Sequence, residues 1–123
     1  MLSDSHEFEK KSESVAVRYL KKNGYKILIQ NYRTKLGEID IIAKDKDTLV
    51  FVEVKARRSS YYANPKWGVT LKKQKKISMV ALWYLKSTKQ NRTKARFDVV
   101  AVSAGGDKPK IELIKNAFEL AYG

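Results

Sequence analysis

Hydrophobic residues recur at helical intervals in two segments of the chain and alternate with polar residues in five others. Intervals of three or four residues place apolar side chains on one face of a helix, whereas alternation places them on one face of a strand. The first helix is expected to end at Asn23-Gly24, because glycine readily adopts the backbone conformation that follows a helix. The predicted elements are a helix over 7–23, strands over 25–31, 38–44 and 49–57, a helix over 71–87, strands over 97–103 and 111–114, and a helical turn over 117–121.

The order of these elements, α-β-β-β-α-β-β, predicts an α/β protein with a mixed central β-sheet flanked by helices. The strands over 38–44 and 49–57 are separated by the polar residues 45–48, a connection of the length typical of a β-hairpin. The chain has 123 residues and contains no repeat, low-complexity tract or linker. We therefore expect one domain that spans residues 1–123.

The scarcity of cysteine and histidine limits the chemistry available to the chain. It contains no cysteine and a single histidine, His6. This composition excludes disulfides, thiolate zinc sites and cysteine nucleophiles, and it argues against serine–histidine triads and histidine-rich metal sites. Any catalysis must therefore depend on carboxylates. No apolar run approaches the length of a membrane span and the N-terminal residues are too polar for a signal peptide, so we expect a cytoplasmic protein without membrane attachment.

The positive charge of the chain is concentrated in one stretch. The formal net charge is +13, and residues 54–97 contain 13 Lys and Arg but no Asp or Glu. Such a stretch is typical of proteins that bind the phosphate backbone of nucleic acids. A solvated surface that only keeps the protein soluble is the simpler alternative. An anionic membrane surface fits less well, because no separate basic amphipathic segment with a broad apolar face is present.

Two predicted strands carry acidic residues within otherwise apolar sequence. Glu53 and Lys55 share one face of the strand over 49–57, and the hairpin would bring Asp40 of the strand over 38–44 close to them. Burying such groups costs on the order of several kcal/mol unless they are paired or bound to a metal ion. An ordinary cross-strand ion pair of Lys55 with Asp40 or Glu53 is one explanation. The other is metal-assisted phosphodiester hydrolysis, because oxygen ligands suit Mg²⁺ or Mn²⁺ and a lysine can orient water.

The basic stretch also supplies candidate contacts to a nucleic acid. Lysines at the start of the second predicted helix oppose the helix dipole, so a binding role would explain their position, and helix N-termini favour phosphate. The preceding loop interleaves basic residues with Tyr61, Tyr62 and Trp67, which suits backbone contact and stacking on unpaired bases. The alternative role for Trp67 is to cover the edge of the core. The candidate nucleic-acid-binding residues are Arg57, Arg58, Lys66, Lys72, Lys73, Gln74, Lys75 and Lys76.

Several segments of the chain resemble one protein family. They are SESVAVRYLKKNGYKIL (12–28), NYRTKLGEIDIIA (31–43), LVFVEVKAR (49–57), VTLKKQKKI (69–77) and RFDVVAV (96–102). They resemble the YraN family of bacterial proteins, within the PD-(D/E)XK nuclease superfamily and similar to archaeal Holliday junction resolvases. The resemblance covers almost the whole chain and implies a single restriction-endonuclease-like domain. Two positions depart from the pattern, since Ile39 replaces the proline of the superfamily motif and Ser12 replaces a glycine usual in the family.

The resemblance implies roles for individual residues of the candidate site. Asp40 and Glu53 would bind a Mg²⁺ or Mn²⁺ ion together with the main-chain carbonyl of Val54, and Lys55 would be the superfamily's lysine. Glu13 matches the acid with which resolvase-like members complete this site, so the implied catalytic set includes it. A solvent-facing glutamate on the first helix is the alternative interpretation of Glu13.

Glu38 lies two residues before Asp40 on the same strand face, and it either supports the site or pairs with Arg33 or Lys35. Taken together, the residues and the resemblance predict a Mg²⁺- or Mn²⁺-dependent endonuclease that acts on branched or single-stranded DNA. The alternative is a nucleic-acid-binding protein that keeps the nuclease fold without cleavage. Symmetric cleavage of a four-way junction would require two sites, and hence a homodimer.

Overall fold

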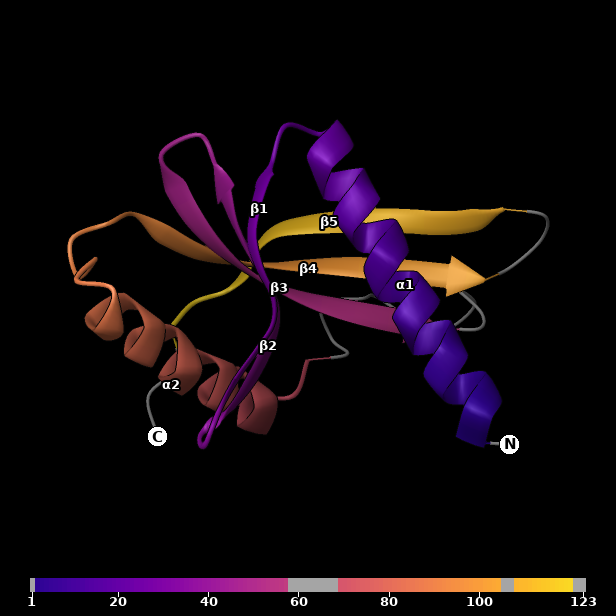
Figure 1. The fold of residues 1–123 in the computed structure, drawn as a ribbon, viewed down its shortest axis with the longest axis horizontal. Helices are drawn as coiled ribbons and strands as arrows, with labels where there is room; N and C mark the ends of the chain where they lie inside the picture. The colour runs from indigo at the N-terminus through magenta and orange to yellow at the C-terminus, as the bar shows by residue number, and fades with distance from the viewer. Residues whose placement is uncertain (1, 58–68, 105–107, 121–123) are drawn as a thin grey trace.

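The structure is a computed structural model that describes residues 2–57, 69–104 and 108–120. The predicted order α-β-β-β-α-β-β is confirmed, and the mixed sheet with its two helices has a restriction-endonuclease-like arrangement (Figure 1). The elements are α1 (Leu2–Lys22), β1 (Lys26–Thr34), β2 (Gly37–Asp45), β3 (Thr48–Arg57), α2 (Leu71–Ser87), β4 (Ala95–Ala104) and β5 (Pro109–Phe118).

The five strands form one sheet in the order β1-β2-β3-β4-β5. Strands β1 and β2, β2 and β3, and β4 and β5 pair antiparallel, whereas β3 and β4 pair parallel. A parallel pair needs a crossover connection, and α2 supplies it between β3 and β4. The first turn of α2 lies beside β3, since Lys73 contacts Glu53.

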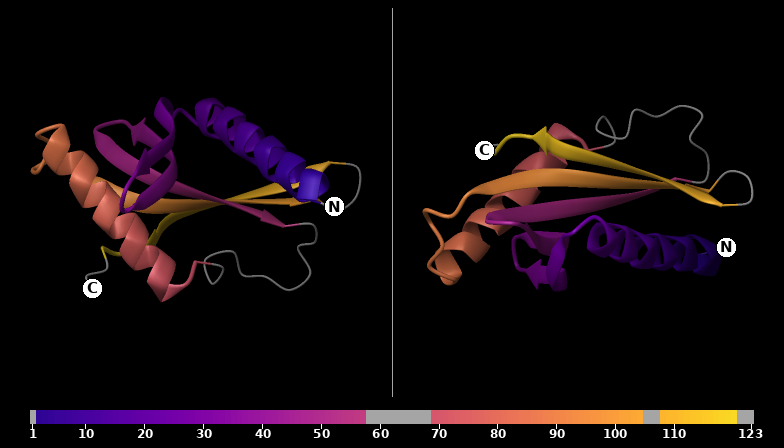
Figure 2. Two further views of the ribbon diagram at one scale, coloured as in Figure 1. Left: turned by 60° about the horizontal axis from the view of Figure 1, so that its bottom comes forward. Right: turned by 90° about the horizontal axis from the view of Figure 1, so that it is seen from above.

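The two helices cover opposite faces of the sheet (Figure 2). Ala16, Val17 and Leu20 of α1 are buried against one face, and Ile77 and Val80 of α2 are buried against the other. Side chains of β3 alternate between the two clusters, as the two-residue period of a strand requires. The side chains of β3 that belong to the α1 cluster are Val50 and Val52, and those of the α2 cluster are Leu49 and Phe51.

Both helices end as the sequence predicts, although α1 begins earlier. The amide of Tyr25 donates to the Leu20 carbonyl at 2.9 Å, and Gly24 has a φ of 90°, so glycine closes α1 as expected. Helix α2 has the bounds predicted for it, and the Thr70 hydroxyl caps it by accepting a hydrogen bond from the Lys73 amide. Neither helix, within the described residues, is long and apolar enough to cross a membrane.

The C-terminal part of the sheet differs from the prediction. Strand β5 runs from Pro109 to Phe118, and residues 119 and 120 have no regular structure. The helical turn expected over 117–121 is therefore wrong for its four described residues, and residue 121 lies outside the described residues. The ring of Phe118 stacks on Phe97 of β4 at a centroid distance of 4.9 Å. The amide of Asn116 donates to the buried carboxylate of Asp98 at 2.9 Å. These contacts to β4 hold the backbone extended, and they outweigh the local preference for a turn.

Candidate functional site

The candidate site forms where β2 and β3 stop pairing. The last paired residues on this side of the hairpin are Ile41 and Val52, and Asp40 and Glu53 follow them directly. Beyond this pair, the amide of Val54 donates to Asp40 Oδ2 at 2.8 Å, so a carboxylate replaces the carbonyl that a continued ladder would provide. The proximity of Asp40 to the Glu53–Val54 segment, which the sequence predicted from the hairpin, is confirmed.

A polar cavity of about 250 Å³ lies at this position. It receives side chains from both layers, since two of its acids belong to α1 and one of its lysines belongs to α2. The residues that line it are Glu9, Glu13, Glu38, Asp40, Glu53, Val54, Lys55, Ala56 and Lys73. All four residues of the predicted catalytic set therefore meet in one pocket, and two further acids and a second lysine join them.

The carboxylates of the pocket are crowded enough to disturb their own ionisation. Burial, and next the charge of Glu53, raise the pKa of Asp40 to about 7, although the Val54 hydrogen bond opposes this effect. Burial and the charge of Glu38 also raise the pKa of Glu13. Carboxyl groups that resist ionisation in this way are short of positive charge, and a cation placed among them would relieve the repulsion.

The half-buried Lys55 also lines the pocket, next to the acids. Burial, followed by the charge of Lys73, lowers the pKa of Lys55, so its amine loses a proton more readily than that of an exposed lysine. Lys55 forms no ion pair with Asp40 or Glu53 in the described part of the chain, so the cross-strand pairs considered as the simple explanation are absent. A basic amine held near carboxylates without pairing to them is free to contact a ligand.

The ion pair of the pocket is made by Lys73 instead. Its Nζ lies 2.7 Å from Glu53 Oε1, and the Glu53 side chain is only 6% exposed. Burial lowers the pKa of Lys73, but the hydrogen bond and the charge of Glu53 outweigh it, and the net effect raises that pKa. The sequence placed Lys73 among the nucleic-acid contacts and allowed it to touch either the site or the substrate. It did not identify Glu53 as the partner, because that contact depends on how α2 packs against the sheet.

The donor chemistry of the pocket fits a hard divalent cation, but its present arrangement is that of a site closed by an ammonium group. Asp40 and Glu53 offer carboxylate oxygens, which Mg²⁺ and Mn²⁺ prefer. Yet across the described ranges no three acidic or imidazole side chains are grouped so that they could hold a metal ion as they stand. In this arrangement one oxygen of Asp40 accepts from Val54, and one oxygen of Glu53 is paired with Lys73.

Glu13 and Glu38 occupy the outer part of the pocket. Glu13 is half-buried and lines the cavity, so the alternative of a fully solvent-facing helix residue does not hold. Glu38 is exposed and pairs with Arg33 at 3.0 Å, one of the two partners that the sequence suggested. Because Glu38 also lines the cavity, its charge acts on Glu13 while its carboxylate is tied to β1.

The outward face of α2 combines lysines with apolar side chains. Lys72, Lys76, Met79, Trp83 and Lys86 recur at intervals of three or four residues, and all five are exposed. Trp83 and Met79 are 52% and 46% exposed, which is unusual for such large apolar groups. The helix carries no acidic residue. We call these five residues the α2 outer face.

The other predicted nucleic-acid contacts are only partly described. Lys75 lies half-buried on α2, and Arg57 lies half-buried at the end of β3. The side-chain amide of Gln74 donates to the Val69 carbonyl at 2.9 Å, so Gln74 supports the segment that enters α2. Arg58 and Lys66 lie outside the described residues, as do Tyr61, Tyr62 and Trp67.

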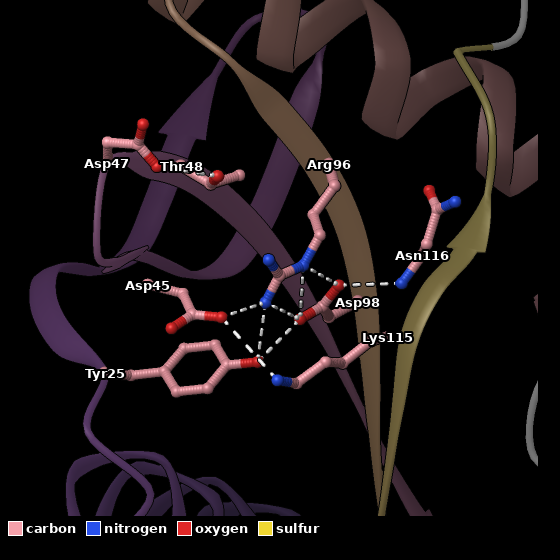
Figure 3. A network of polar contacts seen from close by, with 8 residues as sticks. All are labelled: Tyr25, Asp45, Asp47, Thr48, Arg96, Asp98, Lys115 and Asn116. Carbon is pink, nitrogen blue, oxygen red and sulfur yellow. Dashed lines mark hydrogen bonds and ion pairs between the residues drawn. The ribbon is translucent and has the colours of Figure 1, made fainter.

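A second polar cluster lies on the α1 face of the sheet, near the closed end of the β2–β3 hairpin (Figure 3). Asp98 is fully buried and accepts hydrogen bonds from Tyr25 at 3.0 Å and from Arg96 Nε at 3.0 Å. Arg96 also reaches Asp45 at 2.7 Å. Burial lowers the pKa of Arg96, but its hydrogen bonds to Asp98 and Asp45 outweigh this effect and raise that pKa. The cluster joins Tyr25, which precedes β1, to β2, β4 and β5, and Asp45 and Asp98 both have basic partners.

This cluster was not predicted, although the sequence contains an indication of it. Arg96 and Asp98 stand two residues apart in RFDVVAV, so they share one face of β4. An acid inside a run of valines requires a buried partner, and the arginine two residues earlier is the nearest candidate. The aromatic partner, Tyr25, lies too far away in sequence for any local pattern to assign it.

Comparison with known proteins places the chain in a family. A family model described as "Uncharacterised protein family UPF0102" matches residues 12–102. A UPF0102 protein of Desulfosudis oleivorans is 54% identical over 119 residues, which cover 97% of this chain and 95% of that relative. A UPF0102 protein of Syntrophus aciditrophicus is 55% identical over 114 residues, covering 93% of this chain and 90% of that relative. The chain therefore belongs to the UPF0102 family, also called YraN, as its sequence segments had indicated.

Proposed function

We propose that this UPF0102 protein is a Mg²⁺- or Mn²⁺-dependent endonuclease of the PD-(D/E)XK superfamily, similar to Holliday junction resolvases, and that it cleaves branched or single-stranded DNA. The observation that carries the proposal is the meeting of Asp40, Glu53 and Lys55 in one polar pocket, beside a helix rich in lysine. Two carboxylates and an amine form the minimal set for metal-assisted hydrolysis of a phosphodiester.

The pocket residues would have two roles, binding the divalent cation and positioning the attacking water. The carboxylates of Asp40 and Glu53, with the main-chain carbonyl of Val54 and with Glu13 at the outer side, would hold the divalent cation. When bound, that cation would neutralise the scissile phosphate and stabilise the charge that develops on it. Lys55 lines the same pocket as the acids, and its amine would orient the attacking water toward phosphorus.

The α2 outer face would hold the nucleic acid. Its five residues extend from position 72 to position 86, which corresponds to about 21 Å along a helix. Three lysines would contact phosphates, and the exposed ring of Trp83 offers a platform on which an unpaired base can stack. A regular duplex offers no free base to stack on this apolar surface, because its bases are already stacked on one another. Single-stranded or splayed DNA is therefore the substrate class that this face favours.

A nucleic-acid-binding protein without cleavage is the alternative function, and one observation favours it. The Lys73 ammonium is paired with Glu53, and no three-acid group is present among the described residues. If the ion pair were permanent, the pocket would be a structural feature, and only binding would remain. Paired cuts in a junction would need a homodimer with two sites. The apolar residues of the α2 outer face would then contact the partner subunit instead of the nucleic acid.

The deciding experiment is incubation of the purified protein with labelled single-stranded, duplex, flap and four-way-junction DNA, with and without Mn²⁺. We expect Mn²⁺-dependent cleavage of the single-stranded or branched substrates, lost in Asp40→Asn and Lys55→Met. Lys44→Met is the matched control, because Lys44 is a half-buried lysine of β2 that does not line the pocket. Binding without cleavage of any substrate would leave the alternative function in place. Equal cleavage by wild type and Asp40→Asn would contradict the site assignment.

A further inference from the structure

The Lys73–Glu53 ion pair joins two layers of the fold at the centre of the pocket. Glu53 comes from the middle of the sheet and is buried, whereas Lys73 comes from the first turn of α2. A buried carboxylate is strongly destabilising unless a positive charge neutralises it. A lysine in the first turn of a helix is itself unfavourable, because it faces the positive end of the helix dipole. Each group therefore stabilises the other in a position where either alone would be costly.

The two ends of this ion pair differ in their freedom to move. The Glu53 side chain is 6% exposed, but the Lys73 side chain is 45% exposed. Glu53 is held by a strand that is paired to β4 along its length, since Glu53 opposes Val99. Lys73 reaches the pocket through a flexible four-carbon stem that can also extend into solvent without any change of the backbone. If the pair opens, the lysine is the member that moves.

We propose that Lys73 is the internal counter-ion of this pocket, and that it competes with a divalent cation for the carboxylate of Glu53. This inference rests on the proposed function and adds a regulation of the same site. The ammonium group lies within hydrogen-bond distance of Glu53 Oε1, in the region that a cation ligated by Glu53 and Asp40 would enter. A dication and an ammonium this close repel each other, so uptake of the dication requires Lys73 to leave.

The displaced Lys73 ammonium would move toward the α2 outer face. Lys73 belongs to the same helix turn as Lys72, beside the α2 outer face. A phosphate held on that face would therefore attract the Lys73 ammonium out of the pocket. The acids would then be left without a counter-ion, and a divalent cation would replace it. In this arrangement the metal-free pocket is closed when no nucleic acid is present, and the fold needs no separate lid.

The test is a calorimetric titration of Mn²⁺ into metal-free wild type, Lys73→Met and Lys94→Met, with a thermal melt of each. Lys94 is the matched control, because its Nζ pairs with Asp47 Oδ2 at 3.6 Å on the surface, where both side chains are 76% exposed. We expect Lys73→Met to bind Mn²⁺ about tenfold tighter than wild type, since a competing cation has been removed. We expect Lys94→Met to match wild type.

The melts provide a readout that does not involve activity. Metal-free Lys73→Met should melt at least about 5 °C below Lys94→Met, because it leaves Glu53 buried without a partner. Saturating Mn²⁺ should remove this difference in melting temperature. Lys73→Gln replaces Lys73→Met if the methionine variant does not fold. Lys73→Arg keeps the charge and should bind Mn²⁺ no tighter than wild type.

Three outcomes separate this inference from the proposed function. If wild type binds Mn²⁺ and Lys73→Met binds it no more tightly, the inference is overturned and the proposed function stands. If Lys73→Met gains Mn²⁺ affinity but no variant cleaves DNA, the inference stands and the proposed function fails. If neither wild type nor Lys73→Met takes up Mn²⁺, both are wrong and the ion pair is purely structural.

Discussion

Asp40→Asn should make the metal-free protein more stable at alkaline pH, which is the opposite of what removal of a salt bridge does. The pKa of Asp40 is raised from 3.8 to about 7 by burial and by Glu53. Between these two values the folded state retains a proton that the unfolded state has lost, so the free energy of unfolding falls as the pH rises. Asparagine resembles the protonated carboxyl group, keeps an oxygen that can accept from the Val54 amide, and does not ionise.

The size of the effect follows from the same pKa. A pKa raised by one unit corresponds to about 1.36 kcal/mol, so a pKa near 7 sets an upper limit of about 4 kcal/mol. Because the charged side chains around Asp40 can rearrange when it ionises, we expect about half of this limit, about 2 kcal/mol. Asp40→Asn and wild type should be equally stable below about pH 4, and the variant should exceed wild type by about 2 kcal/mol above about pH 7.

Urea unfolding followed by circular dichroism between pH 4 and pH 8.5 would measure this difference. Asp47→Asn is the matched control, because Asp47 is 76% exposed on the hairpin turn, and its effect should stay within about 0.5 kcal/mol at every pH. Saturating Mn²⁺ should reverse the order, because wild type keeps the ligand that the variant lacks. An Asp40→Asn protein that is less stable than wild type at pH 8 without metal would refute the reasoning, as would a difference that does not change with pH.

Three further changes test other parts of the molecule. Lys55→Met should retain Mn²⁺ affinity, because every carboxylate remains, but should cut about 10²-fold more slowly, measured by single-turnover cleavage; an unchanged rate would remove Lys55 from the mechanism. In Trp67→Phe, Trp83 is the remaining tryptophan, and its fluorescence should be quenched by oligothymidylate more than by duplex DNA of equal length; equal quenching would argue against base stacking. Arg96→Met should cost about 3–5 kcal/mol in urea unfolding, because it leaves Asp98 buried without its main cation; a loss below about 1 kcal/mol would mean that the cluster is not energetically important.

The sequence predicted the elements whose signals are local and missed the contacts that depend on the assembled fold. The α2 bounds were predictable because an apolar stripe and a threonine cap lie within the segment itself. The closeness of Asp40 to Glu53 was predictable as well, since hairpin geometry over a short turn fixes it. The end of β5 was not, because Phe118 is held extended by Phe97, which lies 21 positions earlier in the chain.

The same distinction applies within the pocket. The strand period placed Glu53 and Lys55 on one face, and the structure agrees that both line one cavity. The partner of Glu53 could not be predicted, because Lys73 reaches it only after the crossover has seated α2 against the sheet. The metal ion, the DNA substrate and the catalytic roles of these residues stay predictions, and the experiments above address them in turn.

The polar cluster around Asp98 affects when the pocket can form during synthesis of the chain. Its hydrogen bonds join Tyr25 to Asp98 across 73 positions and Arg96 to Asp45 across 51 positions. Among the described residues, those that line the pocket lie between positions 9 and 73, yet Tyr25, which follows the helix that carries Glu13, is fixed to β4 through this cluster. A chain growing on the ribosome therefore contains every pocket residue before it contains the strand that anchors them. We therefore expect the acidic pocket to assemble only after β4 has emerged, so that an unfinished chain contains the acidic residues without the assembled pocket.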